Sequence, residues 1–254
     1  MDTNSTIKKI NLSRYNLKKY LGSEWDTSKI IDYSDDEISK IYKTPKSQNT
    51  FLSFGSASGC NFTLYHKKIS IHRLHVIYYN FPEIGKPAVK VTKMCSDKLS
   101  DLYSEGVIQP EDSLIIILYN PVPENLNKSI EGLYQSGQEI LRTDGLSEVI
   151  QFKNDKLEDN KYMTEHFKNI HAFHLDEIAI DITLHSMIPD HECIRDQPTI
   201  NQILEDCNAT INQLPSILRT DAMAKRLRLA PGDICKIMRI TTTAGETPYY
   251  RVCK

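Results

Sequence analysis

Histidines in this sequence recur at spacings that could hold a metal ion. His72 and His75 form one pair and His171 and His174 form another, each with two residues between the two imidazoles. A helix would place such a pair on one face. The first pair, however, lies in a predicted strand, where residues three apart face opposite sides, so we do not expect it to chelate zinc.

A third group, His185, His191 and Cys193, is better placed for a zinc ion. Structural zinc takes four ligands, and this group supplies three. The alternative is a turn braced by hydrogen bonds from the imidazoles, and we adopt that interpretation. We therefore predict no metal site and no cofactor.

One carboxylate could belong to a magnesium-dependent nuclease. Such enzymes place a strand carboxylate and a nearby acidic-x-Lys pair around the ion. The nearest approach here is Asp112 with Gln151-Phe152-Lys153, in which Gln151 stands where the second carboxylate is needed. A nuclease is therefore an alternative function, and a strand-edge Asp with a surface Lys explains the same residues. No GxGxxG, P-loop or HExxH motif occurs, so we predict no catalytic residue and no small-molecule substrate.

The end of the chain is basic, although the whole chain is not. The formal net charge over 254 residues is −2, which does not indicate a free-standing duplex binder. From Leu214 to Lys254 there are eight basic and three acidic residues. Within this stretch Lys225, Arg226 and Arg228 fall on a short predicted helix. Such a run is more often a solvated face than a phosphate grip, so their proximity to DNA is a hypothesis only.

The first part of the chain alternates helical and extended patterns, which predicts a layered α/β domain. The segment 112–119 is apolar on both faces, so helices are expected to cover it on both sides. A mixed charged run at 153–161 indicates a solvated connection. The predicted helices are 7–21, 35–41, 94–103 and 126–134, and the predicted strands are 61–66, 73–79, 112–119 and 148–152.

A different module follows, and the overall class is therefore α+β. Strict alternation over 178–185 predicts a strand that leads into it. A helix is expected to begin at Pro198, and Asp221 supplies the N-cap of a second helix. Two strands, 234–240 and 248–253, form a predicted hairpin. We place one domain at residues 1–177 and a small C-terminal domain at residues 178–254.

Composition sets further limits on the type of protein. Hydrophobic residues make up 40% of the chain and charged residues 25%, which is typical of a globular protein. The longest apolar run, Leu114–Tyr119, is far short of a membrane span, so we expect an intracellular, soluble protein without a membrane partner. Six cysteines occur without a CxxC pair, and we expect reduced, mostly buried thiols.

Several short motifs in the C-terminal stretch, each weak alone, run in one order and spacing. With them the chain resembles the shared fifth subunit of eukaryotic RNA polymerases, whose C-terminal domain corresponds to a small archaeal polymerase subunit. The N-terminal layout is similar to that family's jaw domain, which the archaeal protein lacks. Ala222 after Asp221 and Ala230-Pro231 before Gly232 depart from the family pattern. The motifs are His185-Ser-Met-Ile-Pro189-Asp-His191, Leu214-Pro215, Arg219-Thr-Asp221, Leu229-Ala-Pro-Gly232, Lys236-Ile-Met-Arg239, Thr243-Ala-Gly245 and Tyr250-Arg251.

The resemblance implies a non-catalytic subunit of a DNA-dependent RNA polymerase. The C-terminal domain would dock on the largest subunit among the other core subunits, and the jaw domain would line the cleft for downstream duplex DNA. The location would be the nucleus for a cellular protein, or a cytoplasmic viral factory or virion for a viral one. A stand-alone DNA-binding regulator is the other alternative. The docking candidates are His185, Pro189, His191, Arg219, Asp221, Lys236, Arg239, Tyr250 and Arg251.

Overall fold

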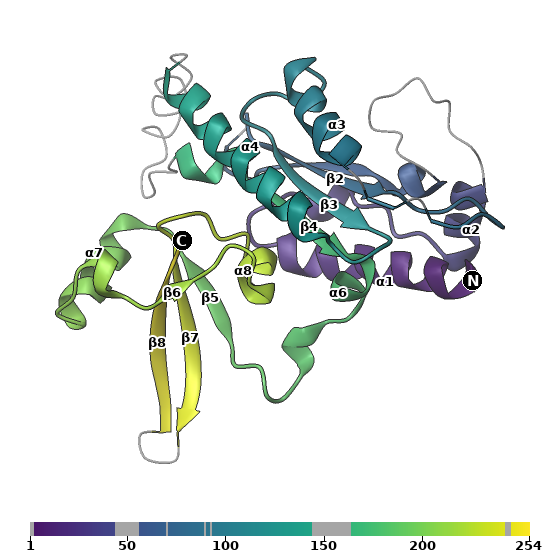
Figure 1. Ribbon diagram of the computed structural model, residues 1–254. Helices are drawn as coiled ribbons and strands as arrows, with labels where there is room; N and C mark the ends of the chain where they lie inside the picture. Colours follow the sequence, from purple (N-terminus) through teal and green to yellow (C-terminus); the bar gives the residue numbers. More distant parts are fainter. Residues whose placement is uncertain are drawn as a thin grey trace. The chain divides into compact units, whose positions relative to one another are not determined.

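The structure is a computed structural model that forms two compact units (Figure 1). It describes residues 3–43, 56–69, 71–88, 90–91, 93–143, 164–241 and 245–254. The first unit comprises Met1–Ile140 and Ile170–Ile180, and the second comprises Leu141–Asn169 and Asp181–Lys254. The chain passes from the first unit to the second after Ile180, three residues beyond the domain boundary predicted at residue 177. Residues 164–169 group with the second unit, although the predicted first domain includes them.

A four-stranded sheet forms the centre of the first unit. Its strands are β1 (Phe62–Tyr65), β2 (Arg73–Tyr79), β3 (Ser113–Leu118) and β4 (Ile170–His174), in the order β1-β2-β3-β4. β1 and β2 are antiparallel, whereas β2, β3 and β4 are parallel. All six residues of β3 are buried, which confirms the central strand that its apolar run predicted.

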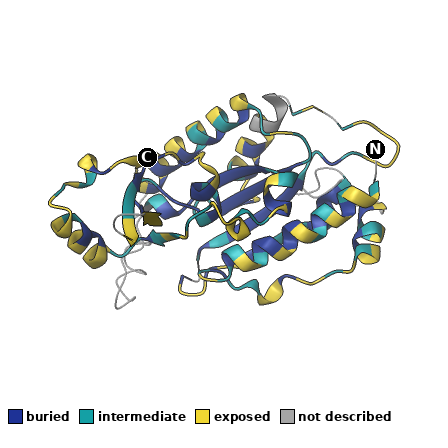
Figure 2. Ribbon diagram, turned by 90° about the horizontal axis from the view of Figure 1, so that it is seen from below, coloured by how far each residue is buried: buried dark blue, intermediate teal, exposed yellow. Residues whose placement is uncertain are grey.

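Helices cover both faces of this sheet. Ile115 and Ile117 pack with residues of α1 (Thr3–Leu21) and α2 (Asp35–Lys43), whereas Leu114 and Ile116 pack with residues of α3 (Lys93–Ser104) and α4 (Glu124–Thr143). Figure 2 shows the strands in dark blue and the outer helix faces in yellow. The layered α/β arrangement is thus confirmed, and α4 is longer than predicted. Short 3₁₀ helices occur at Thr27–Lys29 and Ser56–Cys60.

The strand predicted at 178–185 is wrong. The chain instead forms α6 (Leu175–Ala179) and a 3₁₀ turn (Ile182–Leu184). The Asn16 side chain donates to the carbonyl oxygens of Ile178 and Ala179 at 2.8 and 3.1 Å, and the Asp181 carboxylate accepts from the Thr183 amide at 3.0 Å. The long-range bonds from Asn16 and the local turn at Asp181 take the place of a strand ladder. The strand predicted at 148–152 and the connection at 153–161 lie outside the described residues.

The second unit contains a smaller sheet. Its strands are β5 (His191–Ile194), β6 (Ser216–Ile217), β7 (Ile234–Thr241) and β8 (Gly245–Cys253), in the order β5-β7-β8-β6. β7 and β8 form the predicted antiparallel hairpin, with β5 antiparallel to β7 and β6 parallel to β8. The helices are α7 (Gln197–Asp206) and α8 (Ala222–Leu227), with 3₁₀ turns at Thr164–His166 and Ile211–Gln213.

Both helices of the second unit have an N-cap, and the cap at Asp221 is the one that the sequence predicts. The Asp196 carboxylate accepts from the Thr199 amide at 3.0 Å, and Pro198 stands in the first turn. The Asp221 carboxylate accepts from the Met223 amide at 2.8 Å and so caps α8. None of the helices in the described chain has the length and hydropathy that crossing a bilayer requires.

Candidate partner-docking surface

Four of the predicted docking residues lie on the β7–β8 hairpin. Lys236 is opposite Tyr250 in the register, so these two side chains share one face of the ribbon. Arg239 and Arg251 lie on the other face, because positions an even number apart on a strand share a face. The hairpin therefore carries a docking candidate pair on each face.

Half of this hairpin extends beyond its neighbouring strands. β5 pairs only with residues 234–237 of β7, and β6 pairs only with residues 252–253 of β8. The described residues 239–241 of β7 and 245–251 of β8 therefore have no strand along their outer edges; we call them the projecting half. Figure 1 shows β7 and β8 extending together as a ribbon. Near its tip the apolar side chain of Ile240 is 83% accessible. A two-stranded ribbon is marginally stable alone, so a partner surface would benefit it.

The open edge of β8 is protected against pairing with another strand. Val252 directs its amide outward, where it donates to the Pro215 carbonyl oxygen at 2.9 Å. Pro248 lies four residues before Val252 and so occupies the same edge, but it has no N–H to donate. Proline at an edge position blocks strand addition. Contact with a partner is therefore expected through the side chains on the two faces.

Two arginines flank one tyrosine on the projecting half. The guanidinium carbon of Arg239 lies 4.2 Å from the ring centroid of Tyr249, and that of Arg251 lies 5.5 Å from it. Arg251 also donates to the Ser216 carbonyl oxygen at 3.1 Å. No carboxylate within the described chain forms an ion pair with Arg239 or Arg251. The ring of Tyr249 thus holds the two guanidinium groups in place. Their N–H groups can still donate bidentate hydrogen bonds to a carboxylate.

The segment before β5 forms a turn beside the hairpin. The Met187 amide donates to His185 Nδ1 at 3.2 Å, and His191 Nδ1 donates to the Pro189 carbonyl oxygen at 2.7 Å. The Asp190 carbonyl oxygen accepts from the Met238 amide of β7 at 2.9 Å. These bonds support the interpretation of a turn braced by hydrogen bonds from the imidazoles. Leu184 and Met187 are 77% and 81% exposed, which adds apolar surface to the turn.

The assignments of three other arginines need correction. Arg226 and Arg228 are buried, so they are neither a solvated face nor open to DNA, and the docking candidate Arg219 is buried as well. Arg219 Nη2 donates to the Asn169 side-chain oxygen and Arg228 Nη2 to the Asn169 carbonyl oxygen, both at 3.0 Å. Arg226 Nη1 donates to the Ala222 carbonyl oxygen at 2.9 Å. These cations stabilise the interior of the second unit, and of the predicted DNA-proximal set only Lys225 is partly exposed.

Sequence reasoning missed the centre of this interior, the buried carboxylate of Asp233. It accepts from Arg195 Nε at 3.0 Å, His166 Nε2 at 2.8 Å and the Ala230 amide at 2.8 Å. Burial alone would raise the pKa of Asp233, but Arg195 and His166 outweigh burial and hold the pKa below its usual value. Asp233 stands in the Pro-Gly-Asp turn, which marks it, whereas nothing in the local sequence marks His166 or Asn169.

The first unit has its own buried carboxylate, Asp112, the candidate nuclease ligand. Arg73 Nη2 and Nε donate to its two oxygens at 2.7 and 3.1 Å, and His75 Nε2 lies 3.1 Å from Oδ2. This pairing raises the pKa of Arg73. His72 bonds instead to Ser113 Oγ at 2.9 Å, so the first histidine pair diverges as predicted. Both oxygens of Asp112 are thus occupied by contacts with Arg73 and His75. The other candidate residues, Gln151–Lys153, lie outside the described residues.

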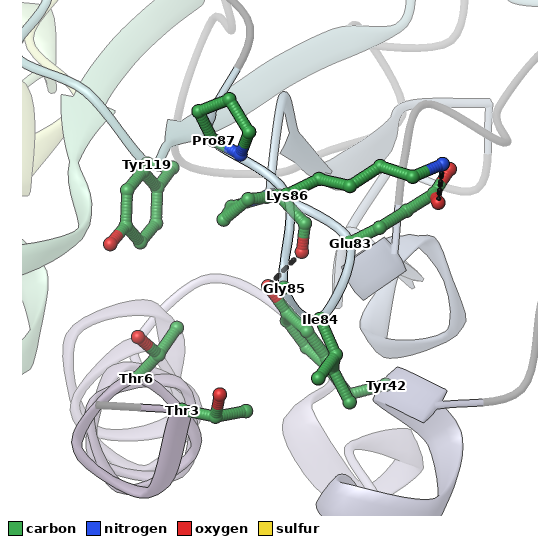
Figure 3. Close-up of a pocket in the computed structure, with 10 residues that line it drawn as sticks. Thr3, Thr6, Tyr42, Glu83, Ile84, Gly85, Lys86, Pro87 and Tyr119 are labelled. Carbon is green, nitrogen blue, oxygen red and sulfur yellow. Dashed lines mark hydrogen bonds and ion pairs between the residues drawn. The ribbon is translucent and has the colours of Figure 1, made fainter. Parts of the chain in front are cut away.

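A pocket of about 290 Å³ opens in the first unit, beyond the carboxyl ends of β2 and β3 (Figure 3). Thr3, Thr6 and Tyr119 face it, while the Lys86–Glu83 ion pair extends away from it. The Tyr42 hydroxyl donates to the Pro82 carbonyl oxygen at 2.5 Å, and burial raises the pKa of this phenol to about 12. The lining also includes Glu83 and Lys86, but these two charges pair with each other at 2.6 Å, and the side chains that face the pocket are hydroxyls and a ring.

Comparisons with known proteins agree with the C-terminal features. Residues 180–253 match the family model described as RNA polymerase Rpb5, C-terminal domain. DNA-directed RNA polymerase subunit Rpo5 of Methanococcus maripaludis strain C7 is 42% identical over 71 residues, which is 28% of this chain and 90% of the relative. Subunit Rpo5 of Methanosphaera stadtmanae is 36% identical over 74 residues, 29% of this chain and 95% of the relative. The chain belongs to the Rpb5/Rpo5 family of DNA-directed RNA polymerase subunits, through the C-terminal domain that contains this hairpin.

Proposed function

We propose that this chain is a non-catalytic subunit of a multisubunit DNA-dependent RNA polymerase. In this proposal the second unit docks on the largest subunit and the first unit is a jaw beside the downstream DNA. The family membership of residues 180–253 and the names of the Rpo5 relatives support it. The location would be the nucleus in a cell, or a viral factory or virion for a viral polymerase.

The observation that carries the docking proposal is the Arg239–Tyr249–Arg251 stack on the projecting half. Its two guanidinium groups lie on one exposed face without an acidic partner among the described residues. A carboxylate-bearing partner would form bidentate hydrogen bonds with them, and such bonds strengthen when water is excluded. Interfaces favour Arg and Tyr for this reason. The exposed Ile240 would supply apolar contact at the tip.

DNA contact in this proposal is shared with the rest of the polymerase. The net charge of −2 gives the chain little electrostatic attraction of its own for a duplex. Arg226 and Arg228 are buried, which removes two of the three candidates for phosphate contact. The role beside DNA is therefore positional, and catalysis with its Mg²⁺ belongs to the largest subunits.

Co-purification tests this proposal directly. A tagged full-length chain, expressed in its native cell or infected cell, should recover the large polymerase subunits, identified by mass spectrometry. The double variant Arg239→Glu/Arg251→Glu should lose them. The matched control Lys90→Glu/Lys128→Glu changes the charge by the same amount at exposed sites of the first unit and should retain them.

Other outcomes would replace the proposal. Recovery of the wild-type chain alone would favour a stand-alone regulator. Normal incorporation of the Arg239/Arg251 double variant would contradict the docking assignment but leave the polymerase role. Mg²⁺-dependent DNA cleavage that disappears in Asp112→Ala, while the variant stays folded, would favour the nuclease.

A further inference from the structure

Two cysteines of the second unit stand directly opposite each other on neighbouring strands. Cys193 of β5 is in register with Cys235 of β7, and the two strands are antiparallel. Directly opposed residues in such a pair project from the same face of the sheet. Cys193 packs against the same apolar cluster that contains Cys235 and Cys253. The two thiols therefore share one face of the sheet.

The hydrogen-bond pattern shows which type of pair this is. The Met238 amide donates toward β5, to the Asp190 carbonyl oxygen at 2.9 Å. Amide direction alternates along a strand, so Cys235, three residues earlier, directs its amide and carbonyl toward β8. Cys193 and Cys235 are thus a non-hydrogen-bonded pair, for which the Cα atoms lie about 4.5 Å apart. Disulfides span Cα separations of roughly 4.4 to 6.8 Å, so the pair falls within reach of a bond.

The third thiol on this face is less well placed. Cys253 of β8 donates its amide to the Asp233 carbonyl oxygen at 2.8 Å, so it lies opposite Asp233 and diagonal to Cys235. Diagonal neighbours are about 7 to 8 Å apart, too far for an unstrained disulfide. Cys193 and Cys253 are separated by a whole strand, about 9.5 Å. Geometry selects the Cys193–Cys235 pair.

We propose that Cys193 and Cys235 form a reversible disulfide when the chain meets a small-molecule disulfide such as oxidised glutathione. Neither cysteine forms a disulfide in the structure, which therefore represents the reduced form, and the Cys193 thiol donates to Asp233 Oδ2 at 3.8 Å. The bond would join β5, which directly follows the braced turn at 185–190, to the base of the hairpin. The inference does not depend on the proposed polymerase role.

Disulfide formation takes two steps, and the exposure of the two thiols indicates which cysteine reacts first. Cys193 is partly exposed and Cys235 is buried, and burial raises the pKa of the Cys235 thiol to about 11. Because Cys193 is the more accessible thiol, it reacts first: it gives up its proton and attacks the disulfide of the oxidant, which releases one glutathione thiolate. Cys235 then loses its proton and attacks the Cys193 sulfur, which releases the second glutathione. Two protein thiols are oxidised to one disulfide, and one glutathione disulfide is reduced to two thiols.

The test uses the full-length chain in native buffer with increasing ratios of oxidised to reduced glutathione. Samples are alkylated, digested without reduction and mapped by mass spectrometry. A peptide that links Cys193 to Cys235 and vanishes on reduction is expected. Exposed Cys207 is the internal control and should carry only glutathione. The oxidised chain should also melt at a higher temperature than the reduced chain, and the partly exposed Cys193→Ser variant should lose both the link and the shift.

Two results would overturn the proposal. One is a Cys193 that carries glutathione while Cys235 remains reduced under all conditions. The other is a link that joins Cys235 to Cys253 instead. Both are read from the wild-type peptide map, so neither depends on the folding of a variant.

Discussion

The two ends of the β7–β8 hairpin differ in what their charged groups contact. At its base, Asp233 is buried and bonded to Arg195, His166 and a backbone amide. In the projecting half, Arg239 and Arg251 lie against one tyrosine ring and have no carboxylate partner in the described chain. The same two strands therefore hold the fold together at one end and, among the described residues, present cations without a carboxylate partner at the other.

Burial, not residue type, separates the structural cations from the proposed docking cations. Arg219 and Arg239 both occupy motif positions of the family. The first turns inward and binds Asn169, whereas the second is exposed. A substitution that leaves a buried cation without its partner lowers the stability of the fold. A substitution of an exposed cation changes the stability very little. Variants at the two ends should therefore separate folding from assembly.

The largest expected effect is at the base. Asp233→Ala would leave Arg195 and His166 buried without their shared carboxylate and should lower the free energy of unfolding by about 3 to 5 kcal/mol. Urea unfolding followed by circular dichroism measures it. Asp190→Asn, a change at an exposed carboxylate near β5, is the matched control and should stay close to wild type. A small loss in Asp233→Ala would mean that the base is not held by this ion network.

The pH dependence of the same site follows from its pKa. The folded-state pKa of Asp233 lies below the ordinary value of 3.8, so its contribution is complete above that value and is lost as pH falls through the folded pKa. Asp233→Asn resembles the protonated acid. The stability gap between wild type and Asp233→Asn should be widest near neutral pH and close in strong acid. A gap independent of pH would contradict an ionic role for Asp233.

A smaller effect is expected at the helix cap. Asp221→Ala removes the acceptor for the Met223 amide and should cost about 1 kcal/mol of stability. Asp221→Ser should restore most of the loss, because a serine hydroxyl also accepts at an N-cap. Thermal unfolding measures both. If Asp221→Ser regains stability but not incorporation into the polymerase, Asp221 contacts a partner as well as capping α8.

The smallest effect on stability is expected in the projecting half. Arg239→Glu/Arg251→Glu should change the free energy of unfolding by less than about 1 kcal/mol, because surface changes away from buried features are nearly neutral. The same variant should lose polymerase incorporation. Loss of stability comparable to that of Asp233→Ala would remove the distinction between the two ends.

Much of the fold could be predicted from local pattern. The apolar run 112–119 identified the central strand, and Asp221 identified the start of α8, because each signal lies within the element itself. The alternation of apolar and polar residues over 178–185 predicted a strand that does not form. Asn16, more than 160 residues earlier, instead binds the Ile178 and Ala179 carbonyl oxygens. A contact so distant in sequence leaves no local periodicity.

The site was predictable only in part, for the same reason. The motifs placed Lys236, Arg239, Tyr250 and Arg251 on one hairpin, which the structure confirms. Motif position could not show that Arg219 and Arg228 face inward, since their burial depends on Asn169. His166 lies before the region of family similarity, and only the folded chain brings it to Asp233.

The most direct test of the docking claim is site-specific cross-linking in the purified polymerase. A photoreactive amino acid at Ile240, which is 83% exposed, samples the tip of the projecting half, and one at exposed Lys128 is the control. We expect a covalent adduct with the largest polymerase subunit from position 240 and none from position 128. An assembled polymerase that gives no adduct from position 240, or the same adduct from both positions, would contradict the docking claim.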